Sequence, residues 1–439
     1  MEGVPQILAL NVGFGMPRPK DEPFHSALSA YLGDPETREL VGVIDSARSA
    51  MVQAVVSEDV DPQQKAAGIL RYLPLARTLC SSWDSSNLAA PPQTWWTTGL
   101  GGAVAFQCAS TFGCEVNMTL ATLAAVLSVE GTQLAKRTPP EYRRAAAFFC
   151  KAAGIYSVLA RNAGPFESEE NPVELSEHIA AGMRDVCMAS AHRLALAVAI
   201  GDGTQVKGGA LKAKLCAGYV ACLEEAIGTM RSRAGAAYDK LQGVFKSCLA
   251  FHVAMGRGLM WLFQAIGHAE NTETGSAIYC VRQALLFLRE RPSMLESGYP
   301  PLQGFLADYA AQVEAVRAYA QEQEQQYIHD NNTVYFNTIP DDLLAPSGAT
   351  IMKESAFEMP DAEGHMMTFT PAVESAAPPT YTSAFGPAPP SYDSLIRPPG
   401  QSGQQAQAQA GGGGGGALQR SDSDLARELQ ERLNRGEDI

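Results

Sequence analysis

The 439-residue sequence is poor in basic side chains. It holds 33 Lys and Arg against 47 Asp and Glu, a net charge of −14, and the last hundred residues alone carry fourteen acidic and six basic groups. Binding to nucleic acid depends on clustered Lys and Arg that neutralise phosphates. An acidic chain of this kind is therefore not expected to bind DNA or RNA.

Signals for secretion and for membrane insertion are also lacking. Residues 1–16 contain no basic flank followed by an apolar run and a small-residue cleavage site, as a signal peptide would. The longest uninterrupted apolar run, Leu194–Ile200, is far shorter than the roughly 20 residues of a membrane-spanning helix. Nine cysteines contain no Cys-x-x-Cys pair, which favours reduced core thiols over a disulfide framework. We expect a cytoplasmic protein whose association with membranes is peripheral and runs through its partners.

Motifs for catalysis, metal binding and cofactor binding are missing as well. The glycine-rich stretches Gly13–Gly15 and Gly99–Gly102 do not continue as dinucleotide or phosphate loops, so turns are the simpler interpretation. The seven histidines lack metal-ligand spacing, and no serine stands in a Gly-x-Ser-x-Gly elbow. We therefore expect no catalytic residue, no metal and no cofactor. A helical enzyme with scattered catalytic residues stays open as a weaker alternative.

Helical periodicity is what the sequence has in abundance. From Pro35 to Asp330 apolar residues recur every three or four positions, and Pro and Gly residues divide the pattern into segments. Residues Phe112–Leu134 and Lys240–Gly267 are apolar on more than one face, which is typical of a helix packed between neighbours. The sequence predicts a mainly α fold, a curved helical solenoid with a TPR-like core, preceded by a few short strands before Pro35.

The helical pattern fails after Asp330. Residues Asn331–Thr338 and Ala349–Lys353 are predicted to form an extended arm that closes a folded domain of residues 3–358. Residues 359–417 are rich in Pro, Ala, Gly and Gln and hold too few aliphatic side chains to offset the entropy of ordering, so we predict disorder there. Helical spacing returns over residues 418–436, which predicts a short amphipathic helix.

Five stretches match the motifs of one protein family, in the family's order: Gln93–Thr98, Cys114–Ala125, Ala145–Tyr156, Leu211–Leu215 and Asp330–Pro340. Together they resemble the Bro-one domain, a boomerang-shaped helical module of ESCRT-associated proteins. Gly154 lies inside the third stretch, where glycine costs about 1 kcal/mol relative to alanine, so we expect it to permit close approach of a neighbouring helix. A plain TPR-like repeat protein is the alternative, but the sequence shows no consistent 34-residue period.

The resemblance implies a non-catalytic adaptor that binds the C-terminal helix of an ESCRT-III filament subunit on its concave face. Carried over by position, the apolar binding patch comprises four leucines: Leu194, Leu196, Leu211 and Leu215. Leu211 and Leu215 lie four residues apart and so share a helix face. The bulky aromatic that the family places on the preceding helix is replaced by Ala195, and an ordinary core role for these leucines is equally open.

Such an adaptor would act in endosomal or multivesicular-body sorting or in membrane scission, and would be recruited from the cytoplasm to endosomal membranes. Two alternatives stay open: an ambient-pH or other signalling adaptor of the same family, and a helical repeat scaffold unrelated to ESCRT.

The predicted disordered tail carries two PPxY motifs eleven residues apart. Prolines favour the polyproline II conformation that the aromatic groove of a WW domain binds. The residues that would contact WW domains are Pro378, Pro379 and Tyr381, then Pro389, Pro390 and Tyr392, with Leu395 extending the second motif. Tandem ligands raise avidity for a protein with several WW domains, and we expect WW-domain proteins such as HECT-type ubiquitin ligases, or other WW-domain adaptors, as partners.

The predicted terminal helix places leucines at every fourth position. Leu425, Leu429, Arg432 and Leu433 resemble the type-one MIT-interacting motif, which predicts an MIT-domain protein as a possible partner. The last leucine of that motif is replaced by Gly436, so a generic amphipathic helix is an equally good interpretation.

Overall fold

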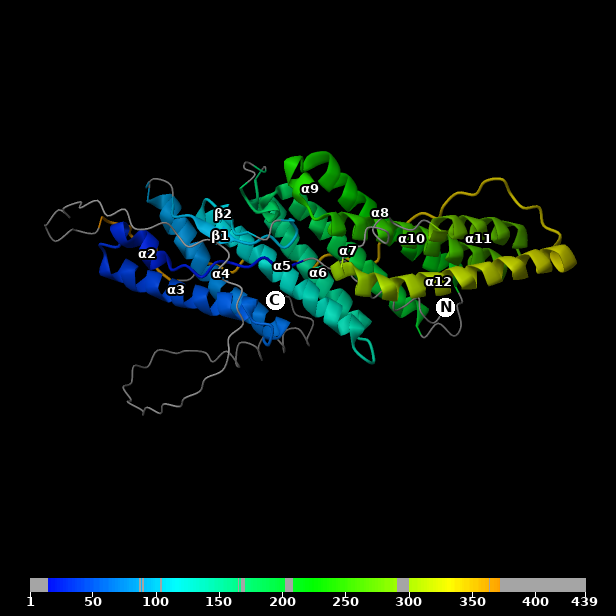
Figure 1. Cartoon of the computed structure of the whole chain (residues 1–439), viewed down its shortest axis with the longest axis horizontal. Coiled ribbons are helices and arrows are strands. Elements are labelled where there is room, and N and C mark those ends of the chain that lie inside the picture. The colour runs from blue at the N-terminus through cyan, green and yellow to red at the C-terminus, as the bar shows by residue number, and fades with distance from the viewer. Residues whose placement is uncertain are drawn as a thin grey trace.

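The computed structural model describes residues 15–371, except 87, 89–90, 103–104, 165, 167–169, 202–207, 290–299 and 363. Within this part of the chain, long helices follow one another (Figure 1). They are α3 (Pro35–Val56), α4 (Pro62–Ser85), α5 (Phe112–Lys136), α6 (Tyr142–Asn162), α7 (Glu177–Ile200), α8 (Gly209–Arg233), α10 (Gly243–Glu270), α11 (Thr274–Arg289) and α12 (Pro300–Asp330). The shorter elements are α2 (Phe24–Leu28), α9 (Ala236–Lys240), 3-10 turns at Ser29–Tyr31 and Val173–Leu175, and a π-helical turn at Asn331–Tyr335.

Each long helix packs against the next long helix along the chain. The pairs run in order from α3 with α4 to α7 with α8, then α8 with α10, α10 with α11 and α11 with α12. Figure 1 shows the result as an elongated row of helices with α3 at one end and α11 and α12 at the other. Packing between neighbours in sequence is the defining property of a solenoid. The predicted mainly α, solenoid-like fold is confirmed.

Local sequence signals fix where several helices begin. The Asp34 carboxylate accepts a hydrogen bond from the Thr37 backbone amide (2.8 Å) and Pro35 follows as the first helical residue of α3. Asp61 caps α4 in the same way through the Gln64 amide (2.8 Å), again followed by proline. A capping side chain satisfies an amide that has no partner inside the helix, and proline has no amide to satisfy.

The strands are few, as predicted, and residues 6–13, one of the two stretches on which that prediction rests, lie outside the described residues. β1 (Thr94–Trp96) and β2 (Gln107–Ala109) form a two-stranded antiparallel sheet in which Trp95 pairs with Cys108. Among the described residues before Pro35, the extended backbone makes single bridges only, from Pro19 to Trp96 and from Leu32 to Thr370. These N-terminal residues are indeed extended, but they attach to partners far along the chain rather than to each other.

Two helices, α5 and α10, are long and apolar enough to cross a membrane by length and composition. In their most apolar windows, however, 78% of α5 and 72% of α10 is buried inside the protein. α5 packs against both α4 and α6, and α10 packs against both α8 and α11. Their apolar faces therefore belong to the core, as the multi-faced pattern of these segments predicts.

A buried carboxylate joins the first three long helices and the sheet. Glu115 in α5 accepts hydrogen bonds from Arg48 Nε of α3 (2.8 Å), the Tyr72 hydroxyl of α4 (2.9 Å) and Trp96 Nε1 of β1 (2.6 Å). All four side chains are buried. Burial lowers the pKa of Arg48, but the facing Glu115 and Tyr72 outweigh it and hold that pKa above its usual value, so the guanidinium stays charged. Arg48 also donates to the backbone oxygens of residues 20 and 22, which fixes the N-terminal segment.

After α12 the chain returns along the row of helices as an extended segment, which we call the arm (residues 336–371). It runs from the α12 end of the molecule back to the α2 end (Figure 1). Successive arm residues contact α11, α10, α8, α6, α4 and α3: Asp342 bonds Tyr279, Leu344 bonds Gln264, Ala349 bonds Lys214, Ser355 bonds Cys150, Pro360 bonds Arg77 and Thr368 bonds Thr37. The arm therefore contacts six helices in reverse chain order.

One prediction about this region needs correction. Asn331–Tyr335 form a π-helical turn rather than extended chain, because the Asn331 side chain accepts from the Thr274 hydroxyl (2.7 Å) and from the Asn337 amide (2.8 Å). Beyond the predicted domain end at residue 358, which stays a prediction, residues 364–371 continue the arm along α3 and α4. Met367 and Phe369 are buried there, and the Phe369 ring lies 5.1 Å from that of Trp83. A few apolar side chains suffice because they enter a site that the helices have already formed.

The Glu115 network predicts a large effect of one substitution. Glu115→Ala leaves the Arg48 guanidinium buried without its carboxylate, and removing one partner of a buried pair costs about 3–5 kcal/mol. We expect a loss of this size in the free energy of unfolding, measured by urea denaturation followed by circular dichroism. Glu224→Ala is the matched control, because Glu224 pairs with Arg257 at the exposed surface, where such pairs contribute about 1 kcal/mol or less. Equal losses in the two variants would contradict the assignment.

Candidate functional site

The arm lies in close contact with three helices at positions that have no side chain. Gly154 of α6 faces the Ser355 carbonyl, Gly218 of α8 faces that of Ala349, and Gly275 of α11 faces that of Thr338. A Cβ atom at any of the three positions would overlap the arm backbone. Gly154 does permit a close approach, as predicted, but the approaching segment is the arm and not a helix.

Hydrogen bonds fix the arm at these crossings. The Ala349 amide donates to the Lys214 carbonyl of α8 (3.0 Å), and the Ser355 amide donates to the Cys150 carbonyl of α6 (3.0 Å). Next to the second crossing, the Ser157 hydroxyl donates to the Glu354 carboxylate (2.6 Å). The arm thus forms part of the surface wherever it crosses α8 and α6.

The four predicted patch leucines do not share one environment. Leu211 is 60% exposed, whereas Leu194, Leu196 and Leu215 are buried in the hydrophobic core. Of the four, only Leu211 is accessible at the surface, the other three have the core environment that the sequence left open, and the binding patch itself stays a prediction. Leu194 and Leu196 are buried because α7 packs between α6 and α8. Leu215 is buried because it lies one helical turn further from the start of α8 than Leu211.

The exposure of Leu211 follows from how α8 begins. Gly208 adopts a left-handed backbone (φ 72°), and the amides of Gly208 and Gly209 donate to the two oxygens of the Glu270 carboxylate (2.8 and 3.1 Å). Gly209 in turn packs against the backbone of Phe263 and Gly267 in α10. A carboxylate at a helix N-terminus satisfies free amides and complements the helix dipole. These contacts hold the first turn of α8, and with it Leu211, at a fixed place beside α10.

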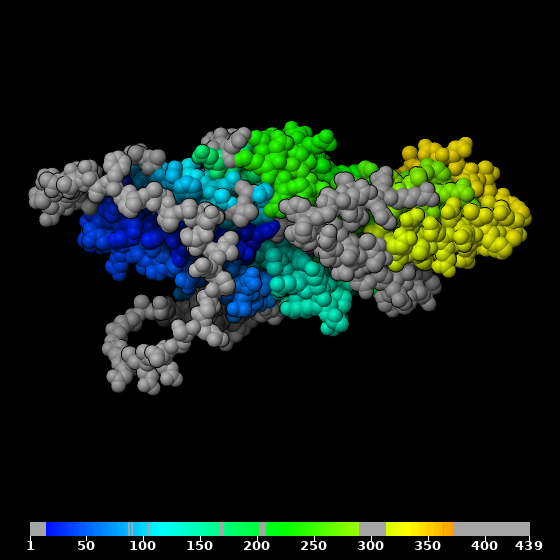
Figure 2. Space-filling model, in the orientation of Figure 1, coloured from blue at the N-terminus to red at the C-terminus, as the bar shows by residue number. Residues whose placement is uncertain are grey.

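Two exposed aliphatic side chains of the arm lie on either side of this turn along its path. Leu344 is 86% exposed, and its carbonyl accepts from the Gln264 side chain of α10 (3.3 Å), one helical turn before Gly267. Ile351 is 53% exposed and follows Ala349, which is bonded one turn beyond Leu211. We call Leu211, Leu344 and Ile351 the crossing surface. Figure 2 shows the first part of the arm, in gold, at the surface next to α12.

Sequence analysis missed the two arm residues of the crossing surface. They stand outside the helical periodicity, so the pattern that selects core positions says nothing about them. The available signal was two apolar pairs, Leu343–Leu344 and Ile351–Met352, outside the helical periodicity, the second of them inside the arm predicted over Ala349–Lys353. Exposed apolar groups that gather on one surface are typical of protein interaction sites.

The crossing surface is apolar in character. Within the described ranges, no group of three or more His, Cys, Asp or Glu side chains is placed to hold a metal ion. All nine cysteines are free thiols, and burial raises the pKa of Cys150, Cys222 and Cys248 to about 11, so these thiols stay protonated at neutral pH. What the crossing surface offers a partner is apolar contact area on a rigid support.

An elongated helical solenoid with a returning arm and an exposed apolar surface belongs to the class of helical scaffold proteins. The family model of the BRO1-like domain matches residues 43–373. The chain therefore belongs to the BRO1-like domain family, and the match ends two residues after the last described arm residue. No curated protein matches the chain.

Solved structures share the fold at low sequence identity. A Bro1 domain studied for endosomal targeting is 15% identical, with a TM-score of 0.60 over 78% of this chain and 91% of that one. The ALIX BRO1 domain in its CHMP4C complex is 16% identical, with a TM-score of 0.58 over 83% of this chain and 99% of that one. ALIX in complex with the SIVmac239 PYKEVTEDL late domain is 16% identical with a TM-score of 0.60, and this chain covers 51% of it.

The remaining predicted sites lie outside the described residues. This holds for the WW-domain ligand residues Pro378 to Leu395 and for the terminal-helix residues Leu425 to Leu433. They stay predictions from the sequence.

The glycine positions give a direct test of the arm. Gly218→Ala puts a Cβ onto the Ala349 carbonyl, so we expect the arm to shift and hydrogen exchange to rise at residues 344–355. Gly228→Ala in the same helix meets nothing within 4 Å, so it should leave exchange unchanged and stabilise α8 by up to about 1 kcal/mol. Exchange followed by mass spectrometry compares the two. Matching exchange in both variants would mean that the arm does not depend on the close approach.

Proposed function

We propose that this chain is a non-catalytic, ESCRT-associated adaptor whose crossing surface receives the C-terminal helix of an ESCRT-III subunit. The observation that carries the proposal is the exposure of Leu211 in the fixed first turn of α8. It lies in the stretch whose resemblance implies the ESCRT-III patch. The structural likeness to an ALIX BRO1 domain bound to CHMP4C supports the same partner class.

The physical basis is helix-in-groove recognition. An amphipathic helix carries apolar side chains at every third or fourth position along one face. Leu211 would contact one such side chain, and Leu344 and Ile351 would contact others on either side. A few apolar anchors dominate the binding energy in such interfaces. The role of the core would then be indirect. Packing of α7 against α8 through Leu194, Leu196 and Leu215 would hold the helix that carries Leu211 in place.

The tail would supply the second half of the adaptor. Its first PPxY motif begins seven residues after the last described arm residue, Pro371, so a WW-domain protein would dock close to the α2 end of the molecule. A HECT-type ubiquitin ligase bound there would sit on the same scaffold as an ESCRT-III filament. This arrangement would bring ubiquitin chemistry and cargo sorting together at endosomal membranes. Recruitment from the cytoplasm would run through these partners, in line with the solved Bro1 domain related to endosomal targeting.

Leu211 is the residue to test. Leu211→Asp puts a charge where the partner needs an apolar contact. We expect the dissociation constant for a fluorescent peptide of the CHMP4-type C-terminal helix, measured by anisotropy, to rise at least about tenfold, the equivalent of 1.4 kcal/mol. Leu286→Asp on α11 is the control, because Leu286 is similarly exposed, at 52%, and lies outside the crossing surface. A variant that binds as tightly as the wild type, with an unchanged circular dichroism spectrum, would rule out the assignment.

The tail motifs are tested separately. Tyr381→Ala combined with Tyr392→Ala removes the side chain that fills the second pocket of each WW domain. In a pull-down on immobilised tandem WW domains we expect the double variant to be lost and either single variant to be retained at reduced yield, because avidity needs both motifs. Equal recovery of the wild type and the double variant would count against WW binding and leave the ESCRT-III proposal untouched.

A further inference from the structure

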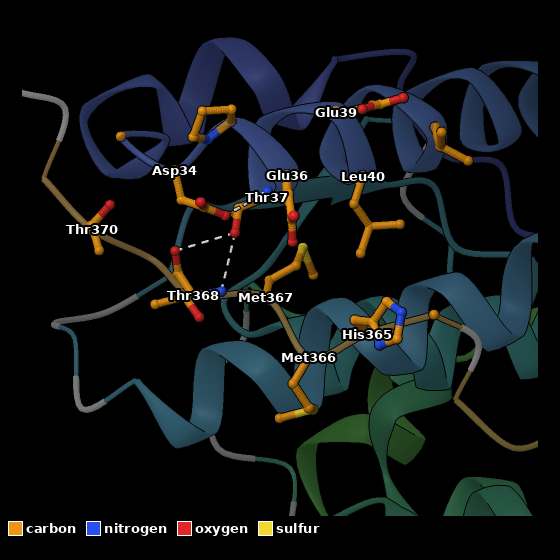
Figure 3. A pocket seen from close by; sticks show the side chains of 14 residues that line it. Asp34, Glu36, Thr37, Glu39, Leu40, His365, Met366, Met367, Thr368 and Thr370 are labelled. Carbon is orange, nitrogen blue, oxygen red and sulfur yellow. Dashed lines mark hydrogen bonds between the residues drawn. The ribbon is translucent and has the colours of Figure 1, made fainter.

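A second candidate surface lies at the other end of the molecule, where the arm ends. A groove of about 860 Å³ opens between the first turns of α3 and arm residues 364–370 (Figure 3). Thr37 closes its floor, since the Thr37 hydroxyl donates to the Thr368 carbonyl (3.2 Å) and accepts from the Thr368 amide (3.0 Å). We call it the α3–arm groove.

One part of the groove wall is apolar and accessible. Val43 is 50% exposed and Met366 is 55% exposed. Leu40, which lines the groove with them, is half-buried. Figure 3 shows Leu40 directed from α3 toward His365 of the arm. Gly364 has a left-handed backbone (φ 96°), and a Cβ there would lie within 3.7 Å of a Leu40 methyl group. The missing side chain therefore leaves the groove open beside Leu40.

The rest of the wall is acidic. Asp34, Glu36 and Glu39 line the groove, and no Lys or Arg does. Asp34 is engaged as the cap of α3, and its hydrogen bonds with Thr37 lower its pKa. Glu36 and Glu39, both exposed, have no ion pair or side-chain hydrogen bond with any described residue. A ligand that offers an aliphatic face with an arginine on it would complement both parts of the wall.

The chain itself contains such a segment. In the predicted terminal helix, Leu425 and Leu429 are four residues apart, and Arg432 follows three residues after Leu429, so all three share one helix face. Asp424 and Glu431 flank this face, and Glu428, four residues before Arg432, lies at its edge. This segment has no assigned place in the proposed adaptor function beyond the resemblance to an MIT-interacting motif.

The position at which the described chain ends favours this occupant. Pro371 directly follows Thr370, which lines the groove, and 46 residues, 372–417, separate it from the segment. A random-coil chain of that length has a root-mean-square end-to-end distance of about 40 Å, which is long enough for the segment to reach the groove. A tethered ligand on a linker of this kind has an effective concentration of about a millimolar, and even a weak contact would then be occupied.

We propose that residues 418–435 dock in the α3–arm groove of their own chain, with the leucines against Leu40, Val43 and Met366 and with Arg432 against Glu36 and Glu39. Docking would hold the tail as a loop and keep the terminal segment from MIT-domain partners until they compete for it. The proposal is independent of the ESCRT-III and WW assignments, since it uses neither the crossing surface nor the PPxY motifs.

Photo-crosslinking in the full-length chain tests the proposal. With p-benzoylphenylalanine in place of Met366, we expect mass spectrometry to find crosslinks to residues 418–435 of the same chain, with a yield independent of protein concentration. The same group in place of Leu286 on α11, 52% exposed, is the control and should give no such crosslink. Arg432→Glu, which lies in the tail and leaves the folded domain unaltered, should lower the yield at least about fivefold.

A charge exchange completes the test. Glu36→Arg with Glu39→Arg should also lower the yield about fivefold, and adding Arg432→Glu to that pair should restore it. The proposal is wrong if the crosslinks at position 366 reach no tail residue, if they reach another part of the tail, or if they join two chains with a yield that rises with concentration. It is also wrong if the charge exchange does not restore the yield.

Discussion

The close approach of the arm to the helices is the contact on which both candidate surfaces depend. The arm can lie against α6, α8 and α11 only because residues 154, 218 and 275 are glycines. With the arm in place, Leu344 and Ile351 stand beside the first turn of α8, and residues 364–370 complete the α3–arm groove. Without it, the helices alone would present neither surface. Three missing side chains thus decide which surfaces the molecule presents.

Buried polar groups also constrain the fold, because apolar packing between helices does not by itself specify one arrangement of the helices and strands. Glu115 joins three helices and β1, and Glu174 accepts hydrogen bonds from the Thr98 hydroxyl and the amides of Gly99 and Leu100. Burial raises the pKa of Glu174, while these donors oppose the shift. Each carboxylate costs free energy to bury and is stable only with all of its partners in place. Such sites select one arrangement of the neighbouring segments over others of similar apolar burial.

The sequence predicted well what depends on local pattern and poorly what depends on distant contacts. The multi-faced helices α5 and α10 and the family follow from residue types at fixed spacing. The burial of Leu215 could not be predicted from spacing, because Leu215 shares a helix face with the exposed Leu211. The two residues differ only in their position along α8. The contacts of residues 364–371 with α3 and α4 likewise depend on residues far away in the sequence. Met367 and Phe369 are stable in a site that α4 provides, and no local pattern reports on a site formed elsewhere.

The returning arm changes the connectivity of contacts in the solenoid. In a linear array each helix contacts its neighbours only, so that the ends open independently and stability is a sum of nearest-neighbour contributions. Here the hydrogen bond between Thr37 and Thr368 joins residues 331 positions apart and ties the two ends of the row to each other. The arm follows α12 in the chain and also packs against α3. Opening of the α12 end therefore loosens the segment that packs against α3. Unfolding should then approach a single cooperative event, and a change at one end of the molecule has a physical route to the other.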